Sequence, residues 1–118
     1  MVHHKNLNVW KKSMDFVTEI YQITKNFPAD ELHALSVQLR RCAVSIPSNI
    51  AEGCARFSDS DTLKFLYIAI GSCAEAETQI IIAKNLGYIN ENEKILISLE
   101  EINKMLTGLI KHLKLKET

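Results

Sequence analysis

Three arginines in the first half of the chain carry a side chain suited to binding phosphate. Arg40 and Arg41 stand together in a predicted helix, and Arg56 comes at the end of the same helix. A guanidinium group is planar, keeps its charge and presents donors in a fork that matches a phosphate group. These arginines are therefore candidate nucleic-acid contacts. The alternative is a solvated helix face with ion pairs to nearby glutamates.

A second set of polar residues interrupts an apolar seam in the same helix. The next two positions of this seam at heptad spacing are Asn49 and Gly53, and a polar or missing side chain on a core stripe costs stability unless specific contacts compensate. We expect Asn49, Glu52 and Glu75 to form a structural polar network between this helix and the next, with a ligand pocket at the same residues as the alternative. The apolar part of the seam consists of Leu32, Leu35, Leu39, Cys42 and Ile46.

Other residue patterns give no support to catalysis or metal binding. Bundles that hold two metal ions use Glu-x-x-His pairs, and the sequence contains none. Gly-x-Ser-x-Gly is absent, as is a glycine-rich phosphate loop, and no cysteine has a histidine one helical turn away on the same face. We therefore expect a protein that is not an enzyme, with no catalytic residue, no metal site and no cofactor.

Composition indicates a small globular protein. The 118 residues, 47% of them hydrophobic, suffice for one domain spanning 1–118 with a core of its own. Fourteen basic residues balance fourteen acidic ones, so no overall field draws the chain to nucleic acid, although folding or oligomerisation can create a local basic patch.

Cysteine usage and hydropathy bear on the compartment. Cys42, Cys54 and Cys73 lie among small apolar residues, where reduced thiols act as inert core side chains. Residues 1–12 lack the apolar centre of a secretory signal, and the longest uncharged runs are too short to span a bilayer. We expect a soluble cytoplasmic protein with no membrane partner.

Four helices are predicted from apolar residues at helical spacing. They cover about 7–27, 30–56, 59–86 and 91–115, and no segment alternates at period two as a strand does. Because short connections make successive helices antiparallel neighbours, the predicted fold is all-α, an antiparallel up-down four-helix bundle.

Particular residues are expected to begin, bend and end these helices. Pro47 removes a backbone donor inside the second helix, so we expect a kink there, with two shorter helices as the alternative. The expected N-caps are Asp30, Ser58 and Asn90, and Gly87 is the expected C-terminal cap of the third helix.

The sequence has more apolar surface than one small bundle buries. The first helix carries two adjacent apolar stripes, and residues 42–51 are apolar nearly all round, which indicates a homo-oligomer. Small residues at 69–74 allow another backbone to approach closely, and the basic tail from 111 to 118 is expected to fray.

Several segments resemble one known family closely. Residues 38–53 read Gln-x-Arg-Arg-x-Ala-x-Ser-Ile-Pro-x-Asn-Ile-Ala-Glu-Gly, and residues 65–75 and 86–89 fit the same family. The chain resembles the four-helix-bundle proteins encoded within intervening sequences of bacterial 23S ribosomal RNA genes. That resemblance implies a homopentameric ring. It also implies kinship with the accessory protein of diversity-generating retroelements, a basic, nucleic-acid-binding partner of a reverse transcriptase.

Three functions from different classes remain open at this point. The first is a non-enzymatic homo-oligomeric bundle that binds structured RNA through Arg40, Arg41 and Arg56. The second is a scaffold or adaptor ring that docks a protein partner and has no intrinsic RNA affinity. The third is a small-molecule pocket around Asn49, Glu52 and Glu75.

Overall fold

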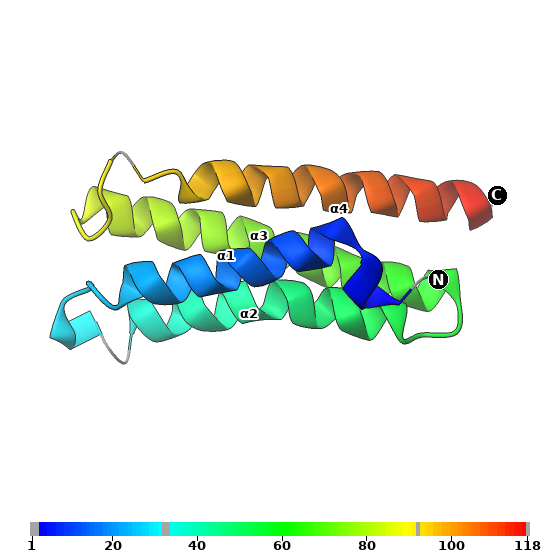
Figure 1. Ribbon diagram of the computed structural model, residues 1–118, viewed down its shortest axis with the longest axis horizontal. Helices are drawn as coiled ribbons and strands as arrows, with labels where there is room; N and C mark the ends of the chain where they lie inside the picture. Colours follow the sequence, from blue (N-terminus) through cyan, green and yellow to red (C-terminus); the bar gives the residue numbers. More distant parts are fainter. Residues whose placement is uncertain (1–2, 32–33, 92, 118) are drawn as a thin grey trace.

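The computed structural model describes residues 3–31, 34–91 and 93–117, and their regular structure is entirely helical. Figure 1 shows each long helix running antiparallel to the one before it, and α2 and α3 share the most extensive contact. The predicted all-α four-helix bundle is confirmed. The elements are η1 (His4–Asn6), α1 (Asn8–Thr24), η2 (Ala29–Glu31), α2 (Leu35–Cys54), α3 (Asp59–Asn85) and α4 (Ile95–Glu117).

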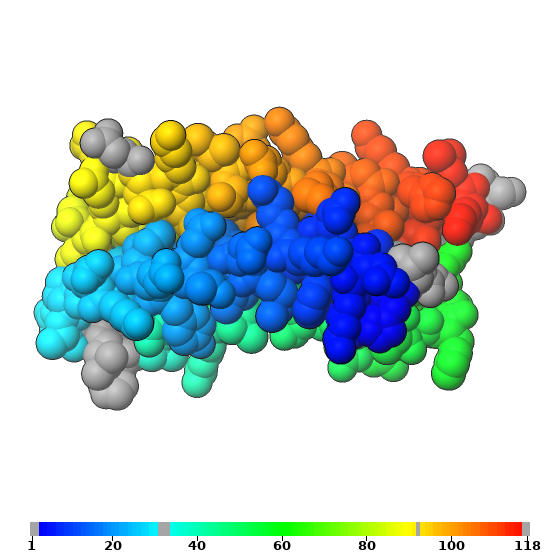
Figure 2. All heavy atoms as spheres, viewed as in Figure 1, coloured from blue at the N-terminus to red at the C-terminus, as the bar shows by residue number. Residues whose placement is uncertain are grey.

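Aliphatic side chains from all four helices form the core. Each contributes about 1.5–3 kcal/mol when it leaves water, so this layer dominates the energetics. On the face shown in Figure 2, side chains of α1 cover the bundle between α4 and α2. The largest fully buried side chains include Phe16 and Ile20 of α1, Leu39, Ile46 and Ile50 of α2, Leu66 and Ile80 of α3, and Ile95, Ile102, Leu106 and Leu113 of α4.

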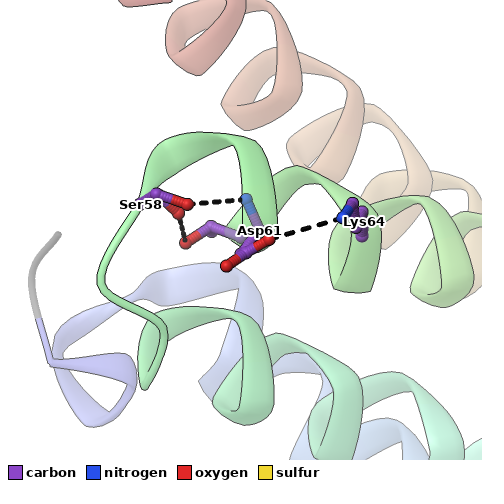
Figure 3. Close-up of polar contacts among 4 residues, drawn as sticks. Ser58, Asp61 and Lys64 are labelled. Carbon is purple, nitrogen blue, oxygen red and sulfur yellow. Dashed lines mark hydrogen bonds and ion pairs between the residues drawn. The ribbon is translucent and has the colours of Figure 1, made fainter.

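Local capping residues fix both ends of α3 as the sequence predicts. The Ser58 hydroxyl accepts a 3.1 Å hydrogen bond from the backbone N–H of Asp61, which satisfies an amide of the first turn (Figure 3). At the other end Gly87 adopts φ +78°, and the amides of Gly87 and Tyr88 donate back to carbonyls of the last turn. This is the Schellman arrangement, in which glycine avoids the strain of a left-handed backbone.

The second helix begins later than predicted. Asp30 belongs to the separate turn η2, and α2 starts at Leu35, so Asp30 does not cap it. The reason is tertiary, because Phe27 is buried and its ring lies 5.5 Å from that of Tyr88. The chain is therefore held across this end of the bundle before it enters α2. Leu32, at the start of the predicted seam, lies outside the described residues.

The fourth helix also differs from its predicted limits. It begins at Ile95, so Asn90 is not its N-cap, and the intervening chain buries Ile89 before the helix starts. At its other end α4 continues as a helix to Glu117 where fraying was expected. Burial of Leu113 holds the basic tail against the core.

Pro47 lies within one continuous helix. Because α2 extends from Leu35 to Cys54, the alternative of two shorter helices is wrong, while the kink at Pro47 stays a prediction. A proline inside a helix costs about 3 kcal/mol or more. Complete burial of Ile46 and Ile50 on either side offsets part of that cost.

Helices α2 and α3 approach each other closely at Gly53, and not at Gly71 in the small-residue stretch. A Cβ on Gly53 would lie 3.1 Å from the carbonyl oxygen of Thr62 and 3.2 Å from Cβ of Phe65. At Gly71 no described atom outside its own helix turn lies within 4 Å of such a Cβ. The contact between the two helices therefore depends on the missing side chain at position 53.

We predict that Gly53→Ala destabilises the protein. The added methyl group meets backbone that cannot move aside easily, so the free energy of unfolding should fall by about 1–3 kcal/mol in urea denaturation followed by circular dichroism. Gly108→Ala is the matched control in open space on α4 and should raise stability by about 0.5–1 kcal/mol. Equal responses of the two variants would contradict a close approach at Gly53.

Candidate functional site

Polar side chains link α2 to α3 along one seam. Nδ2 of Asn49 donates to the carbonyl oxygen of Ser45 at 2.8 Å and lies 2.9 Å from its hydroxyl oxygen. The Ser45 hydroxyl lies 2.7 Å from that of Ser72 on α3. The half-buried Asn49 is thus satisfied within its own helix, and the two serines carry the connection between helices.

Glu75 lies farther along the same seam. Its Oε1 accepts a 3.3 Å hydrogen bond from Nε2 of Gln79, and it lies close to the thiol of Cys42. That thiol donates to the carbonyl oxygen of Ser72 at 2.9 Å. Within the described part of the chain, Oε1 of the buried Gln79 has no hydrogen-bond partner. This end of the seam is therefore less well satisfied than the end at Asn49.

Glu52 is separate from the seam. Its carboxylate is exposed and pairs with Arg56 at 3.0 Å, one helical turn away. Such exposed pairs contribute about 0–1 kcal/mol. Of the three residues predicted to form a polar network, Asn49 lies in the seam, the exposed Glu75 borders it beside Cys42, and Glu52 lies on the surface away from it.

The three arginines occupy different environments. Arg40 is half-buried, its Nε donates to the hydroxyl of Thr24 at 2.7 Å, and its guanidinium lies 4.7 Å from the centre of the Tyr21 ring. Arg40 therefore braces α1 against α2. Arg41 is exposed beside it, while Arg56 lies 4.6 Å from the ring of Phe65 at the far end of α2.

The spacing of these arginines excludes a single shared site within one chain. Arg56 follows Arg41 by four helical turns, which corresponds to about 20 Å along the helix. A ligand that contacts both must be extended, or must bridge more than one copy of the protein.

A shallow groove follows the contact between α1 and α2. One part, of about 420 Å³, is bordered by Arg40 and Arg41, and a second part of about 360 Å³ begins at the shared residue Val44. We call this surface the α1–α2 groove. Its apolar lining residues are Trp10, Met14, Val17, Tyr21, Val37, Val44, Pro47 and Ala51.

The outer face of α3 carries exposed isoleucines among small and polar residues. By length and composition alone α3 resembles a membrane-spanning helix, but it packs between α2 and α4, with 39% of its most apolar window buried. On the exposed side, Ile68 and Ile82 keep 50% and 43% of their surfaces in water, with Gly71 between them. We call the exposed residues 68, 71, 75, 78 and 82 the α3 stripe, and their spacing is that of a coiled-coil seam.

The cysteines are poorly suited to nucleophilic chemistry. Burial raises the pKa of Cys73 to about 12, and burial together with the Glu75 carboxylate raises the pKa of Cys42 to about 12. Burial also raises the pKa of Cys54. Among the side chains that the structure describes, no group of three or more His, Cys, Asp and Glu residues is placed to hold a metal ion.

Sequence reasoning missed the residues that hold the predicted ones in place. Ser45 precedes Asn49 by four residues, a spacing that brings two side chains together on a helix, so this partner was accessible from the sequence. Thr24 and Ser72 are distant in sequence from the residues they contact, and they become neighbours through packing.

The fold and this seam place the chain among antiparallel four-helix-bundle proteins. The sequence profile described as "23S rRNA-intervening sequence protein" matches residues 5–108. The chain belongs to the 23S rRNA-intervening sequence protein family.

A solved structure agrees with this assignment. The fold is similar to that of a protein of unknown function from the S23 ribosomal protein family of Bacteroides thetaiotaomicron, with a TM-score of 0.81 and 30% sequence identity. The similarity covers 87% of this chain and 95% of the other. A comparison with curated proteins gives no match.

We predict that the cysteines react with iodoacetamide in a fixed order. At about pH 8 the half-buried Cys54 should be alkylated first, while Cys42 and Cys73 stay protonated and unlabelled until the chain unfolds. Peptide mass spectrometry with and without urea measures this order. Labelling of all three thiols at one rate in the folded protein contradicts this arrangement.

The thiols of Cys42 and Cys73 also predict how stability depends on pH. In the unfolded chain they lose their protons above a pKa of about 9, whereas in the folded chain they keep them to a pKa of about 12. The free energy of unfolding should therefore fall as the pH rises through that interval.

Proposed function

We propose that this protein is a non-enzymatic homo-oligomeric bundle that binds structured RNA in the cytoplasm. The observation that carries the assembly is that apolar side chains are left exposed outside the core in two separate places, along the α1–α2 groove and at Ile68 and Ile82 of the α3 stripe. Exposed apolar patches on soluble proteins mark interaction surfaces when they are contiguous.

The two apolar surfaces differ in shape, which favours a ring. The groove is concave and includes Met14 and Tyr21, which keep 43% and 40% of their surfaces exposed, whereas the stripe is the ridge of a single helix. A contact between unlike surfaces is head-to-tail, and repetition of that contact by a rotation closes into a ring. We propose that the α3 stripe of one copy lies in the α1–α2 groove of the next, in a ring of five copies.

RNA is the proposed ligand because of the family and the exposed cations. The family is named for intervening sequences of 23S rRNA, and we propose a relationship to the nucleic-acid-binding accessory protein of diversity-generating retroelements. Arg41 and Arg56 are exposed, and a ring repeats both around its axis. Multivalent contact then raises the overall affinity beyond that of one chain.

We predict that each apolar surface is required for assembly. Light scattering after size exclusion should give a multiple of the 13.4 kDa chain mass for the unaltered protein, and a single chain for Met14→Glu and for Ile82→Glu. An equimolar mixture of these two variants should form dimers, since each retains the surface that the other has lost.

The control for this experiment is Ile97→Glu. Ile97 is 55% exposed on α4, outside both surfaces, so its replacement should leave the assembly mass unchanged. An unaltered protein that elutes as one chain contradicts the proposed assembly. Variants that stay monomeric when mixed contradict the head-to-tail contact.

We predict that the protein binds the RNA hairpin transcribed from its own intervening sequence with a steep salt dependence. Each phosphate contact contributes about 0.7–0.9 to the slope of log affinity against log salt, so replacement of Arg41 and Arg56 by alanine should weaken binding and flatten the slope. Arg40→Ala should chiefly lower stability, because Arg40 is held by Thr24 and Tyr21. Absence of binding at low salt would favour the adaptor ring with a protein partner.

A further inference from the structure

One end of the bundle combines the turn between α2 and α3 with the last turns of α4. Figure 1 shows both segments at this end, and in Figure 2 atoms of both are exposed there. Nζ of Lys114 lies 5.5 Å from the centre of the Tyr67 ring, which joins the end of α4 to the first half of α3. We call this surface the turn end.

The described side chains of the turn end are mostly basic although the whole chain is neutral. Residues 102–116 of α4 contain four lysines, and the next acidic residue is Glu117, the last residue of the helix. Two of the acidic side chains near the turn, Glu52 and Asp61, are paired with Arg56 and Lys64 of the same surface. Among the side chains that the structure describes at the turn end, the exposed cations are Arg56, Lys64, Lys111, Lys114 and Lys116, and the acidic residues are Glu52, Asp59 and Asp61.

An aromatic ring is exposed in the turn that belongs to this surface. The side chain of Phe57 is fully exposed, more so than any other large hydrophobic residue described. Its sequence neighbours Arg56 and Ser58 are polar, and Leu115, another strongly exposed apolar side chain of the turn end, stands in sequence between Lys114 and Lys116. Burial in the fold gives no reason for a phenylalanine here.

The turn that carries Phe57 is built from well-formed hydrogen bonds. The hydroxyl of Thr62 donates to the carbonyl oxygen of Gly53 at 2.7 Å, and the Ser58 cap closes the start of α3, as Figure 3 shows. The backbone N–H of Thr62 also donates to the carbonyl oxygen of Ser58 at 3.0 Å. These contacts hold the chain on both sides of Phe57, so the exposed ring is presented on a fixed support.

We propose that the turn end binds an unpaired loop of RNA, with the Phe57 ring stacked on one base. The lysines at the end of α4 and Lys64 contact the phosphates on either side of that base. Exposed aromatic rings among cations are the combination that binds single-stranded nucleic acid, because each base has a face for stacking and each phosphate a charge. A paired stem offers no free base face, so the loop is the preferred part of a hairpin.

This inference rests on the proposed RNA binding and specifies where and how it occurs. The probe is a hairpin with 2-aminopurine in its unpaired loop, and a fully paired duplex of equal charge is the comparison. We expect tighter binding of the hairpin, with a change in 2-aminopurine fluorescence when the labelled base stacks. Phe57→Ala should weaken hairpin binding about tenfold and abolish the fluorescence change, while Phe57→Trp should restore both.

The charge contribution is tested separately with a double variant. Lys114→Ala with Lys116→Ala should flatten the salt slope by about 0.7 for each phosphate that these lysines no longer bind. The matched control lies at the opposite end of the bundle, where Lys25→Ala with Lys94→Ala likewise removes two exposed lysines. This control should bind like the unaltered protein.

The outcomes separate this inference from the function on which it rests. If the unaltered protein binds neither RNA, both the proposed function and this inference fail. If it binds RNA but Phe57→Ala and the lysine variant bind equally well, the function stands and the turn end is not the contact. Equal affinity for the loop and the duplex also overturns the stacking role of Phe57. Circular dichroism melting confirms that each variant is folded before binding is compared.

Discussion

The close contact between α2 and α3 is the constraint on which the rest of the structure depends. It is the most extensive helix contact in the bundle, and at Gly53 a Cβ would lie only 3.1 Å from the carbonyl oxygen of Thr62. Because the helices approach so closely, Ser45 meets Ser72 across the contact and Thr62 reaches back to the carbonyl of Gly53. The polar seam and the rigid turn at Phe57 both follow from this one approach.

The helices could be predicted from the sequence because apolar spacing reports burial directly. The caps at Ser58 and Gly87 were equally accessible, since capping depends on residues within one turn of each other. The first residues of α2 and α4 could not be predicted from the sequence. They depend on where Phe27 and Ile89 are buried, and that burial is decided by helices elsewhere in the chain.

The candidate site also has parts that the sequence predicts and parts that only the folded structure reveals. Asn49 belongs to the seam, as its place on an apolar stripe suggested, because an amide in that position must find partners. The environment of Arg40 could not be predicted from the sequence, because its partner Thr24 lies sixteen positions away on another helix. A pair of adjacent arginines in sequence therefore consists of one structural residue and one exposed residue.

A net charge of zero describes the whole chain and does not describe any one surface. The sides of the bundle carry the α1–α2 groove and the α3 stripe, whereas the exposed ring of Phe57 and the lysines of α4 lie at the turn end. Contacts made through the sides leave that end open, so the proposed assembly and the proposed RNA binding use different parts of the molecule. In the proposed ring, with its axis along the helices, every turn end would lie on the same rim. Five weak basic surfaces would then act together, and a neutral chain could hold a polyanion.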